Sequence, residues 1–282
     1  MLSDILKLCR RYNIRLDPKL SQNFLHARHV IELEIEAANV RSCDVVLDIG
    51  AGFGFLTELL APLAKKVYAI EVDPDIALVL RERLKNFIEE GKIELIVGDA
   101  LEIDLPLDVT KIVSNPPFHI VSPLMFRLAQ TYFTKPDFEL AVFIVQFEFA
   151  EKLAARPGEK RSRISATIQY FAEVEILSRV SRRNFFPTPN VDSALIRMKP
   201  RRINHIVSFD DYNRVVTILF NTPNRTLRSA IREHFPRNCA EGIIQAIEKR
   251  GISPQIRIRS LDNWQLEVIT EEVTKLKCLG AS

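Results

Sequence analysis

Short runs of consecutive apolar residues alternate with longer amphipathic segments from Asp44 to about Lys199. The apolar runs, bounded by turn residues, predict strands at Val45–Ile49, Lys66–Glu71, Ile93–Val97, Lys111–Ser114 and Glu139–Gln146. The amphipathic segments predict helices at Phe55–Ala64, Pro74–Glu90 and Pro123–Phe133. Because Asp73-Pro74 and Ser122-Pro123 each place a capping side chain before a proline, we expect two of these helices to begin there.

Continuously apolar strands separated by helices predict an α/β domain with a mostly parallel sheet that is covered on both faces. A late strand pair is expected at Val174–Val180 and Asp192–Met198, joined by the proline-rich segment Phe185–Pro189. After Pro200 the hydrophobic period is helical, at Asp210–Asn221, Arg225–His234, Ala240–Lys249 and Asp262–Lys277. The pattern therefore predicts a large domain over residues 1–200 and a small all-helical domain over residues 201–282.

The composition is that of a globular protein, with 47% hydrophobic and 27% charged residues. No apolar run reaches the length of a membrane-spanning helix, and the first residues lack a signal-peptide pattern, so we expect a cytoplasmic protein without membrane contact. Four cysteines, Cys9, Cys43, Cys239 and Cys278, lie far apart and form no C-x-x-C pair. Reduced thiols are expected, and neither a disulfide nor a metal site is.

The net charge of +3 is unevenly distributed along the chain. Residues 1–30 carry +4 and include Arg10, Arg11, Arg15 and Lys19, residues 151–202 carry +7, and the remainder is therefore acidic. Basic charge gathered into two segments beside a predicted core favours a polyanion such as nucleic acid as the partner, although one such segment alone would be an ordinary solvated surface.

A glycine-rich turn, Asp48-Ile49-Gly50-Ala51-Gly52-Phe53-Gly54, follows the first predicted strand of the sheet and opens a helix. Glycine lets the backbone adopt unusual angles and approach a ligand closely, so Gly50 and Gly52 are candidate cofactor-binding residues. The spacing differs from the G-x-G-x-x-G pattern of dinucleotide-binding proteins. Together with Asp48 before the turn, it favours S-adenosylmethionine as the cofactor.

Two acidic residues end the following strands. Glu71 is placed to accept hydrogen bonds from ribose hydroxyls, and Asp99 to accept one from the adenine amine of the cofactor. Asp99 could instead be a turn residue, and we interpret the nearby Asp73 as a helix cap only. The repeated position at strand ends favours ligand binding for Glu71 and Asp99, because ligands of open α/β sheets collect at that edge.

The segment Asn115-Pro116-Pro117-Phe118 ends the fourth predicted strand. The side-chain oxygen of Asn115 and the carbonyl of Pro116 can accept the two N–H groups of an aromatic amine, which turns its lone pair toward a methyl donor. Phe118 offers a ring for stacking on a flipped-out base. In isolation the segment would be a plain turn with a buried phenylalanine. After the glycine turn and two acidic strand ends, it indicates an amino-group methyltransferase.

The chain resembles the rRNA adenine dimethyltransferase family, the KsgA-like enzymes that modify adenines near the 3′ end of small-subunit rRNA. The segments that carry the resemblance are Ser21–Leu25, Val46–Thr57, Ala69–Asp73, Gly98–Ala100, Phe186–Ser193 and Asn224–Arg228. The resemblance implies a Rossmann-like class I methyltransferase fold with a seven-stranded sheet. It also implies that the cofactor is contacted or flanked by Asn23, Leu25, Gly50, Glu71, Asp99 and Asn115.

The implied activity is dimethylation of N6 on two adjacent adenines of small-subunit rRNA during ribosome biogenesis, by a monomer acting on the small ribosomal subunit. Two segments depart from the family. The family usually has N-L-P-Y where this chain has Asn115-Pro116-Pro117-Phe118, and Glu159–Ser162 replaces an aromatic-glycine approach to Arg163. N-P-P-F is typical of other amino methyltransferases. The alternatives are therefore a DNA or other RNA amino-group methyltransferase, or a non-catalytic RNA-binding assembly factor.

Overall fold

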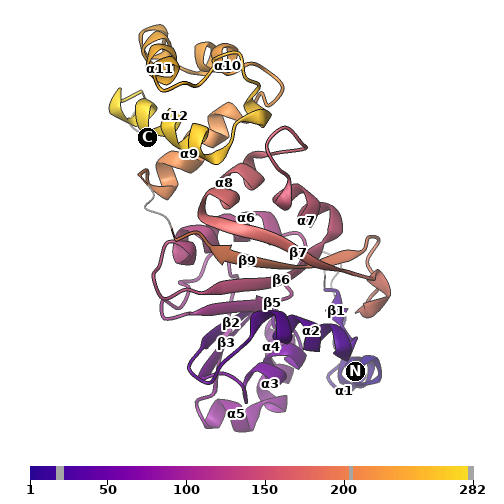
Figure 1. Cartoon of the computed structure of the whole chain (residues 1–282). Helices are drawn as coiled ribbons and strands as arrows, with labels where there is room; N and C mark the ends of the chain where they lie inside the picture. Colours follow the sequence, from indigo (N-terminus) through magenta and orange to yellow (C-terminus); the bar gives the residue numbers. More distant parts are fainter. Residues whose placement is uncertain (17–21, 203–205, 279–282) are drawn as a thin grey trace. The chain divides into compact units, whose positions relative to one another are not determined.

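The structure is a computed structural model that describes residues 1–16, 22–202 and 206–278 (Figure 1). Lys19 of the basic N-terminal segment and Ser21 of the Ser21–Leu25 motif lie outside the described residues. The chain forms two compact units. The first comprises Met1–Ala150 and Ala172–Pro200, and the second comprises Glu151–Phe171 and Arg201–Ser282.

A seven-stranded sheet forms the centre of the first unit. In sheet order its strands are β4 (Ile93–Val97), β3 (Lys66–Glu71), β2 (Val45–Ile49), β5 (Lys111–Ser114), β6 (Leu140–Gln146), β9 (Ser193–Pro200) and β7 (Ala172–Val180). The first five are parallel, whereas β9 is antiparallel to both of its neighbours. The predicted strands and the mostly parallel sheet are confirmed. The sequence could predict them because strands of a parallel sheet that is covered on both faces carry consecutive apolar residues.

Helices flank this sheet and connect its strands (Figure 1). They are α1 (Leu2–Arg11), α2 (Arg28–Ala38), α3 (Phe55–Leu60), α4 (Pro74–Arg83), α5 (Lys85–Glu89) and α6 (Val121–Leu128), the last continued by a π-helical turn, η2 (Ala129–Phe133). The predicted helix 74–90 is in fact two helices that meet at Leu84. The sequence pattern did not assign α1 or α2.

One of the two predicted helix caps is present. Asp73 caps α4, its side chain accepting hydrogen bonds from the backbone N–H groups of Asp75 and Ile76. The prediction for Ser122 was wrong, because α6 begins at Val121 and has no side-chain cap. Proline is tolerated anywhere in the first helical turn, so Ser122-Pro123 did not fix the first residue of the helix.

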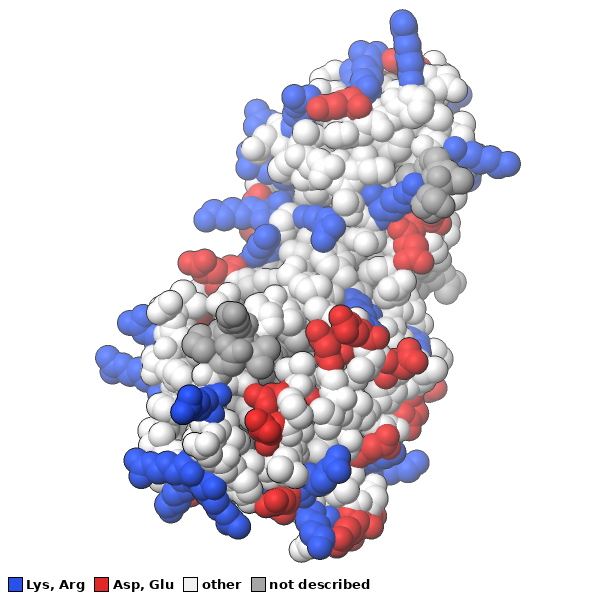
Figure 2. Space-filling view, turned by 180° about the vertical axis from the view of Figure 1, so that it is seen from behind, with Lys and Arg blue, Asp and Glu red and all other residues white. Residues whose placement is uncertain are grey.

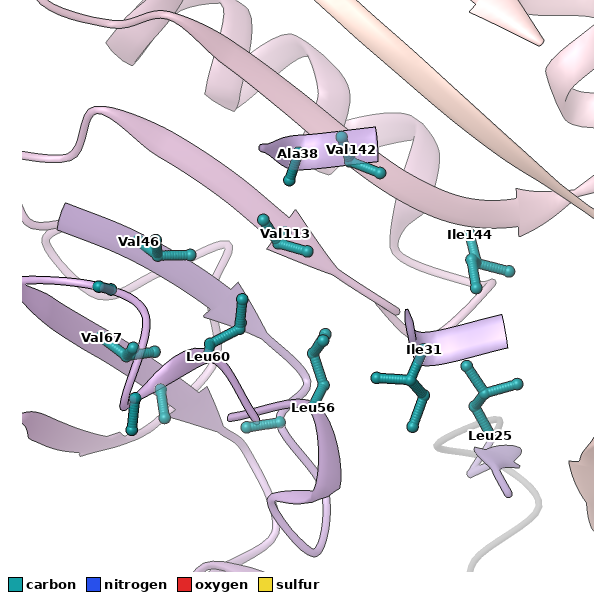
Figure 3. Packing of buried hydrophobic residues seen from close by; sticks show 14 of the residues in the cluster. Leu25, Ile31, Ala38, Val46, Leu56, Leu60, Val67, Val113, Val142 and Ile144 are labelled. Atoms are coloured by element: carbon teal, nitrogen blue, oxygen red, sulfur yellow. The ribbon is translucent and has the colours of Figure 1, made fainter. Parts of the chain in front are cut away.

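The apolar core between sheet and helices positions the strand ends. Ile31 and Ala38 of α2 face Val142 and Ile144 of β6, and Leu60 of α3 lies beside β2 (Figure 3). All of these side chains are at most 1% exposed. Full burial of such a side chain stabilises the fold by roughly 1.5–3 kcal/mol. The sheet is therefore held rigidly beneath its polar edge.

A separate two-stranded sheet joins two distant segments of the first unit. Strand β1 (Phe24–Leu25) pairs antiparallel with β8 (Phe185–Phe186), which follows a short 3₁₀ turn, η3 (Arg182–Asn184). These strands belong to the Ser21–Leu25 and Phe186–Ser193 motifs, or directly adjoin them. Two segments that carry the family resemblance, far apart in the sequence, therefore meet in space.

The second unit is helical. It contains the end of α7 (Phe147–Ala154), then α8 (Arg163–Phe171), α9 (Phe209–Leu219), α10 (Leu227–His234), α11 (Arg237–Lys249), the 3₁₀ turn η4 (Ile258–Ser260) and α12 (Asn263–Lys275). The rings of Tyr170 in α8 and Tyr212 in α9 stack with centroids 4.0 Å apart. Arg161, 4% exposed, donates to the carbonyl of Leu261 and to Asn263.

The helical prediction after residue 200 agrees with these elements. The predicted boundary at residue 200 put Glu151–Phe171 in the large domain, whereas in the structure this segment belongs to the helical unit. The stacked Tyr170 and buried Arg161 show why this segment groups with the C-terminal helices. The basic segment 151–202 is divided between the two units, and Arg161 contributes nothing to a basic surface.

The expectation that all cysteines are reduced was wrong. Cys239 of α11 and Cys278, just after α12, form a disulfide with Cα atoms 5.9 Å apart. The two residues are 39 positions apart in sequence, and only the packing of α11 against α12 brings them together. Cys9 and Cys43 are free.

We predict two reactive thiols in the denatured, unreduced protein and four after reduction. Cys278→Ser should lower the stability of the helical unit by about 2–4 kcal/mol, because the disulfide restricts the unfolded chain. Thiol titration and thermal unfolding measure the two effects, and Cys43→Ser is the matched control. Four reactive thiols before reduction would show that the bond is absent.

Candidate functional site

Three cavities that share Gly50 lie where β2, β3, β4 and β5 end. Their walls contain every residue that the sequence singled out, namely Asn23, Leu25, Gly50, Gly52, Glu71, Asp99, Asn115, Pro116 and Phe118. Parallel strands end on the same edge of a sheet, so residues that are 44 positions apart in sequence, such as Glu71 and Asn115, line one cavity.

The glycine turn passes very close to the Asn-Pro-Pro-Phe segment. Gly50 and Gly52 have φ angles of +73° and +57°, which other residues rarely adopt. A Cβ atom on Gly50 would lie 2.8 Å from Cδ of Pro117, and one on Gly52 would lie 3.1 Å from the ring of Phe24. Space as well as backbone conformation therefore requires glycine at position 50, whereas at position 52 the backbone conformation is the main constraint and the Phe24 ring would have to move slightly.

A buried hydroxyl joins the ends of β2 and β5. The Oγ atom of Ser114 donates to the carbonyl of Ile49 (2.7 Å) and accepts from the N–H of Ile49 (3.1 Å). The backbone pairing of these strands reaches only Leu47 and Ile112, so the side chain of Ser114 continues the connection. It fixes the distance between the glycine turn and Asn115.

Glu71 supports the glycine turn from the end of β3. It is 6% exposed, and its carboxylate accepts hydrogen bonds from the N–H groups of Gly52 (2.7 Å) and Asp73 (3.0 Å). Desolvation by burial raises the pKa of Glu71 above its usual value. Each oxygen of a carboxylate can accept a second hydrogen bond, so Glu71 can still receive two ligand hydroxyls.

Asp48 lies beneath the turn at the end of β2. Its carboxylate is 1% exposed and accepts a hydrogen bond from the hydroxyl of Thr57 (2.7 Å). Burial is the main cause that raises the pKa of Asp48 to about 7, opposed by the Thr57 hydrogen bond and reinforced by the charge of Glu71. The group therefore titrates near neutral pH.

Asn115 is held by a residue that the sequence analysis did not identify. Its Nδ2 atom donates to Oε2 of Glu34 in α2 (3.0 Å), and its Oδ1 atom is buried without a partner among the described residues. Glu34 is 0% exposed, although the rest of the buried face of α2 is apolar, with Val30, Ile31 and Ala38. One acidic residue within an apolar helical face is the signal that could have revealed it.

Phe118 and Phe185 form an aromatic part of the wall. Their rings meet edge to face with centroids 6.3 Å apart, and both line the cavity that contains Asn115 and Pro116. Asp99 lines the neighbouring cavity with Ala100, and its side chain accepts from the N–H of Leu101 (2.8 Å). That contact supports the turn after β4. Asp99 is therefore a turn residue, and it also lines the cavity where it was expected to meet the adenine amine of the cofactor.

A larger cavity, about 710 Å³, lies elsewhere in the first unit. Lys7 and Arg11 line it together with Asp4 and Glu58. Arg28 and Arg83 also line it, so basic side chains outnumber acidic ones on this wall, and the cavity contains none of the strand-end residues. On the face of the first unit seen in Figure 2, basic side chains gather mainly along the left edge and the bottom, whereas acidic ones lie mostly over the centre and right.

The strand-end cavities fit S-adenosylmethionine in three respects. The glycines leave space that a Cβ would fill, Glu71 has acceptor capacity for a ribose, and buried carboxyl groups suit a cationic sulfonium. Over residues 1–16, 22–202 and 206–278, no three acidic, histidine or cysteine residues are arranged to hold a metal ion. In the same ranges no helix is long and apolar enough to cross a membrane.

Comparisons with known proteins give matches to rRNA methyltransferases. The family model described as "Ribosomal RNA adenine dimethylase" matches residues 13–275. A probable ribosomal RNA small subunit methyltransferase A from Methanothermobacter thermautotrophicus is 35% identical over 283 residues, covering 100% of this chain and 98% of that protein. The protein of the same name from Thermococcus onnurineus is 39% identical over 234 residues, covering 83% and 82% of the two chains.

Solved structures show the same fold. A dimethyladenosine transferase from Plasmodium falciparum matches with a TM-score of 0.79 and 28% identity, covering 90% of this chain and 98% of that one. The 23S rRNA methyltransferase ErmE matches with a TM-score of 0.66 and 27% identity, covering 89% and 100%. The expected Rossmann-like class I methyltransferase fold is confirmed.

We predict that S-adenosylmethionine binds more weakly at pH 6 than at pH 8. A cationic ligand favours the ionised form of Asp48, whose pKa of about 7 means that protons must be displaced at the lower pH. The affinity should change by about three- to tenfold across this range. Calorimetry should show a flatter profile for Asp48→Asn, which cannot ionise, and an unchanged profile for the exposed Asp75→Asn. Identical profiles for Asp48→Asn and the parent would contradict the prediction.

Proposed function

This chain belongs to the ribosomal RNA adenine dimethylase family, and from that premise we propose that it dimethylates N6 of two adjacent adenines near the 3′ end of small-subunit rRNA. S-adenosylmethionine is the cofactor, and its sulfonium supplies the methyl group. The observation that carries the proposal is the unpartnered Oδ1 atom of Asn115, buried in the wall that also contains Phe118.

Asn115 and Pro116 act on the target amine. The lone pair of an adenine amine is delocalised into the ring, and it must be localised on the nitrogen before it can attack the methyl group. Oδ1 of Asn115 and the carbonyl oxygen of Pro116 accept its two N–H groups, which favours a pyramidal nitrogen that points its lone pair at the methyl donor. The rings of proline fix their φ angles, so Pro116 and Pro117 keep these acceptors in place.

Phe118 binds the flipped base. Its ring is supported edge to face by Phe185, so a base can stack on it without disturbing the core. Removing an adenine from its stack costs a few kcal/mol, and base–aromatic stacking returns roughly 1–3 kcal/mol. A phenylalanine keeps the stacking face of the tyrosine that the family usually has here.

The cofactor side is formed by Gly50, Gly52, Glu71 and Asp99, with Asn23 and Leu25 of the β1 segment beside them. Glu71 accepts the ribose hydroxyls, and Asp99 accepts the adenine amine of the cofactor. The buried carboxyls of Asp48 and Glu71 favour the cationic cofactor over the neutral thioether that remains after transfer. This difference assists product release.

The partner in this proposal is the small ribosomal subunit, on which the chain acts as a monomer in the cytoplasm. Arg10 and Arg11 of α1 and the nearby Arg15 form no ion pair within the described part of the chain, so they are available for phosphates. By contrast, Arg179 and Arg197 of the second basic segment are paired with Asp192 and Glu175.

We predict that Asn115→Ala slows single-turnover methylation of unmodified small subunits by about 10²–10³-fold, because it removes a preorganised acceptor. RNA affinity should change little. Phe118→Ala should instead weaken capture of the base, and Phe118→Tyr should retain activity because the stacking face remains. Methyl incorporation followed by nucleoside analysis measures rate and product. Full activity of a folded Asn115→Ala variant would refute the mechanism.

We also predict that replacing Arg10, Arg11 and Arg15 with glutamine lowers affinity for small-subunit rRNA and flattens its dependence on salt. Each lost phosphate contact releases about one counterion fewer, so the slope of log affinity against log salt should fall by about 2–3.

The matched control replaces three basic residues that already have intramolecular partners, Lys66, Lys85 and Lys92, with glutamine. This control keeps the same net charge as the arginine variant. An equal change of slope in both variants would show a general charge effect and no specific role for the arginines.

A further inference from the structure

Glu34 has the features of a residue retained for function. It is a carboxyl side chain with 0% exposure, on a helical face that otherwise packs apolar residues against β6. One of its oxygens accepts from Nδ2 of Asn115, and the other, Oε1, has no partner among the described residues. Burial, followed by the charge of Asp48, raises the pKa of Glu34 well above its usual value. A leucine would serve the core of α2 better.

The contact with Glu34 decides which way the amide of Asn115 faces. The amide is planar, with its donor nitrogen and its acceptor oxygen on opposite sides. Because Oε2 of Glu34 accepts from Nδ2, the Oδ1 atom is directed away from Glu34 and stays without a partner. When Glu34 is ionised, the reversed orientation would place two acceptor oxygens face to face, and the cavity would receive a donor in place of an acceptor.

We propose that Glu34 is a positioning residue for methyl transfer, one that orients the Asn115 amide so that its oxygen accepts the N–H of the target amine. The proposal rests on the function proposed above for Asn115. Glu34 touches neither the base nor the cofactor in this role. Without it the amide samples both orientations, and only one of them turns the lone pair of the amine toward the methyl donor.

The test compares Glu34→Leu and Glu34→Gln with the parent protein on unmodified small subunits, using S-adenosylmethionine with a labelled methyl group. Glu34→Leu should slow single-turnover methylation by about 10²-fold. The KM for subunits and the Kd for the cofactor should stay within about twofold. Glu34→Gln keeps an oxygen that can accept from Nδ2, so its rate should lie between those of the parent and Glu34→Leu. Glu32→Gln, which removes an exposed carboxylate from the same helix, should have no effect.

A double-mutant cycle separates positioning from a structural role. In the Asn115→Ala background, Glu34→Leu should cause no further loss of rate, since its effect passes through the missing amide. Equal losses in both backgrounds, or full activity of folded Glu34→Leu in the parent background, would overturn the proposal. A parent protein that methylates only other nucleic acids would overturn the proposed substrate instead.

Spectroscopy tests the orientation independently of substrate and of how well Glu34→Leu folds. In ¹⁵N-labelled protein the side-chain NH₂ signal of Asn115, assigned by its loss in Asn115→Ala, should exchange slowly with solvent. It should shift in Glu34→Gln and stay in place in Glu32→Gln. A rapidly exchanging signal in the parent, or one that does not respond to Glu34→Gln, would also overturn the positioning role.

Discussion

The hydroxyl of Ser114 is the contact on which the geometry of the site depends. It bonds both to the N–H and to the carbonyl of Ile49, just beyond the point where the backbone pairing of β2 and β5 ends. The two strand ends separate only as far as this side chain allows. The glycine turn therefore lies against Pro117, with a Cβ position of Gly50 only 2.8 Å from its Cδ atom. The ends of two adjacent strands thus bring together the residues proposed to bind the methyl donor and the acceptor.

Three buried carboxyl groups surround this junction, and their burial is unfavourable to the fold. Glu34, Asp48 and Glu71 are each at most 6% exposed, and desolvation raises the pKa of all three. None of them forms an ion pair within the described residues. The apolar core between the sheet and α2 provides favourable burial energy that offsets the cost of burying these three carboxyl groups. Perturbed carboxyl groups in a cavity are typical of functional sites, and here a cationic cofactor is the ligand that favours their ionised forms.

The two-stranded sheet of β1 and β8 joins two segments that carry the family resemblance, Ser21–Leu25 and Phe186–Ser193. Phe24 pairs with Phe186, and Leu25 with Phe185. Phe24 contacts the glycine turn through Gly52 and Phe53, while Phe185 supports Phe118. One residue pair of this small sheet thus contacts the glycine turn, and the other contacts Phe118, the ring proposed to stack on the base. The two motifs lie near opposite ends of the first unit's sequence, and Phe24 and Phe185 from these segments line the same cavity.

The sequence by itself determined the strands of the sheet, the glycine turn and the acidic strand ends, because these depend on local apolar patterns and on where a strand stops. It also indicated a family whose site residues line three shared cavities. It could not determine the segment 151–171, whose place depends on long-range contacts such as the stacking of Tyr170 on Tyr212. Nor could it determine the Cys239–Cys278 bond or the contact of Glu34 with Asn115, which are separated by 39 and 81 positions. The acidic Glu34 interrupts an apolar helical face, but its partner leaves no local pattern, since only tertiary packing brings such side chains together.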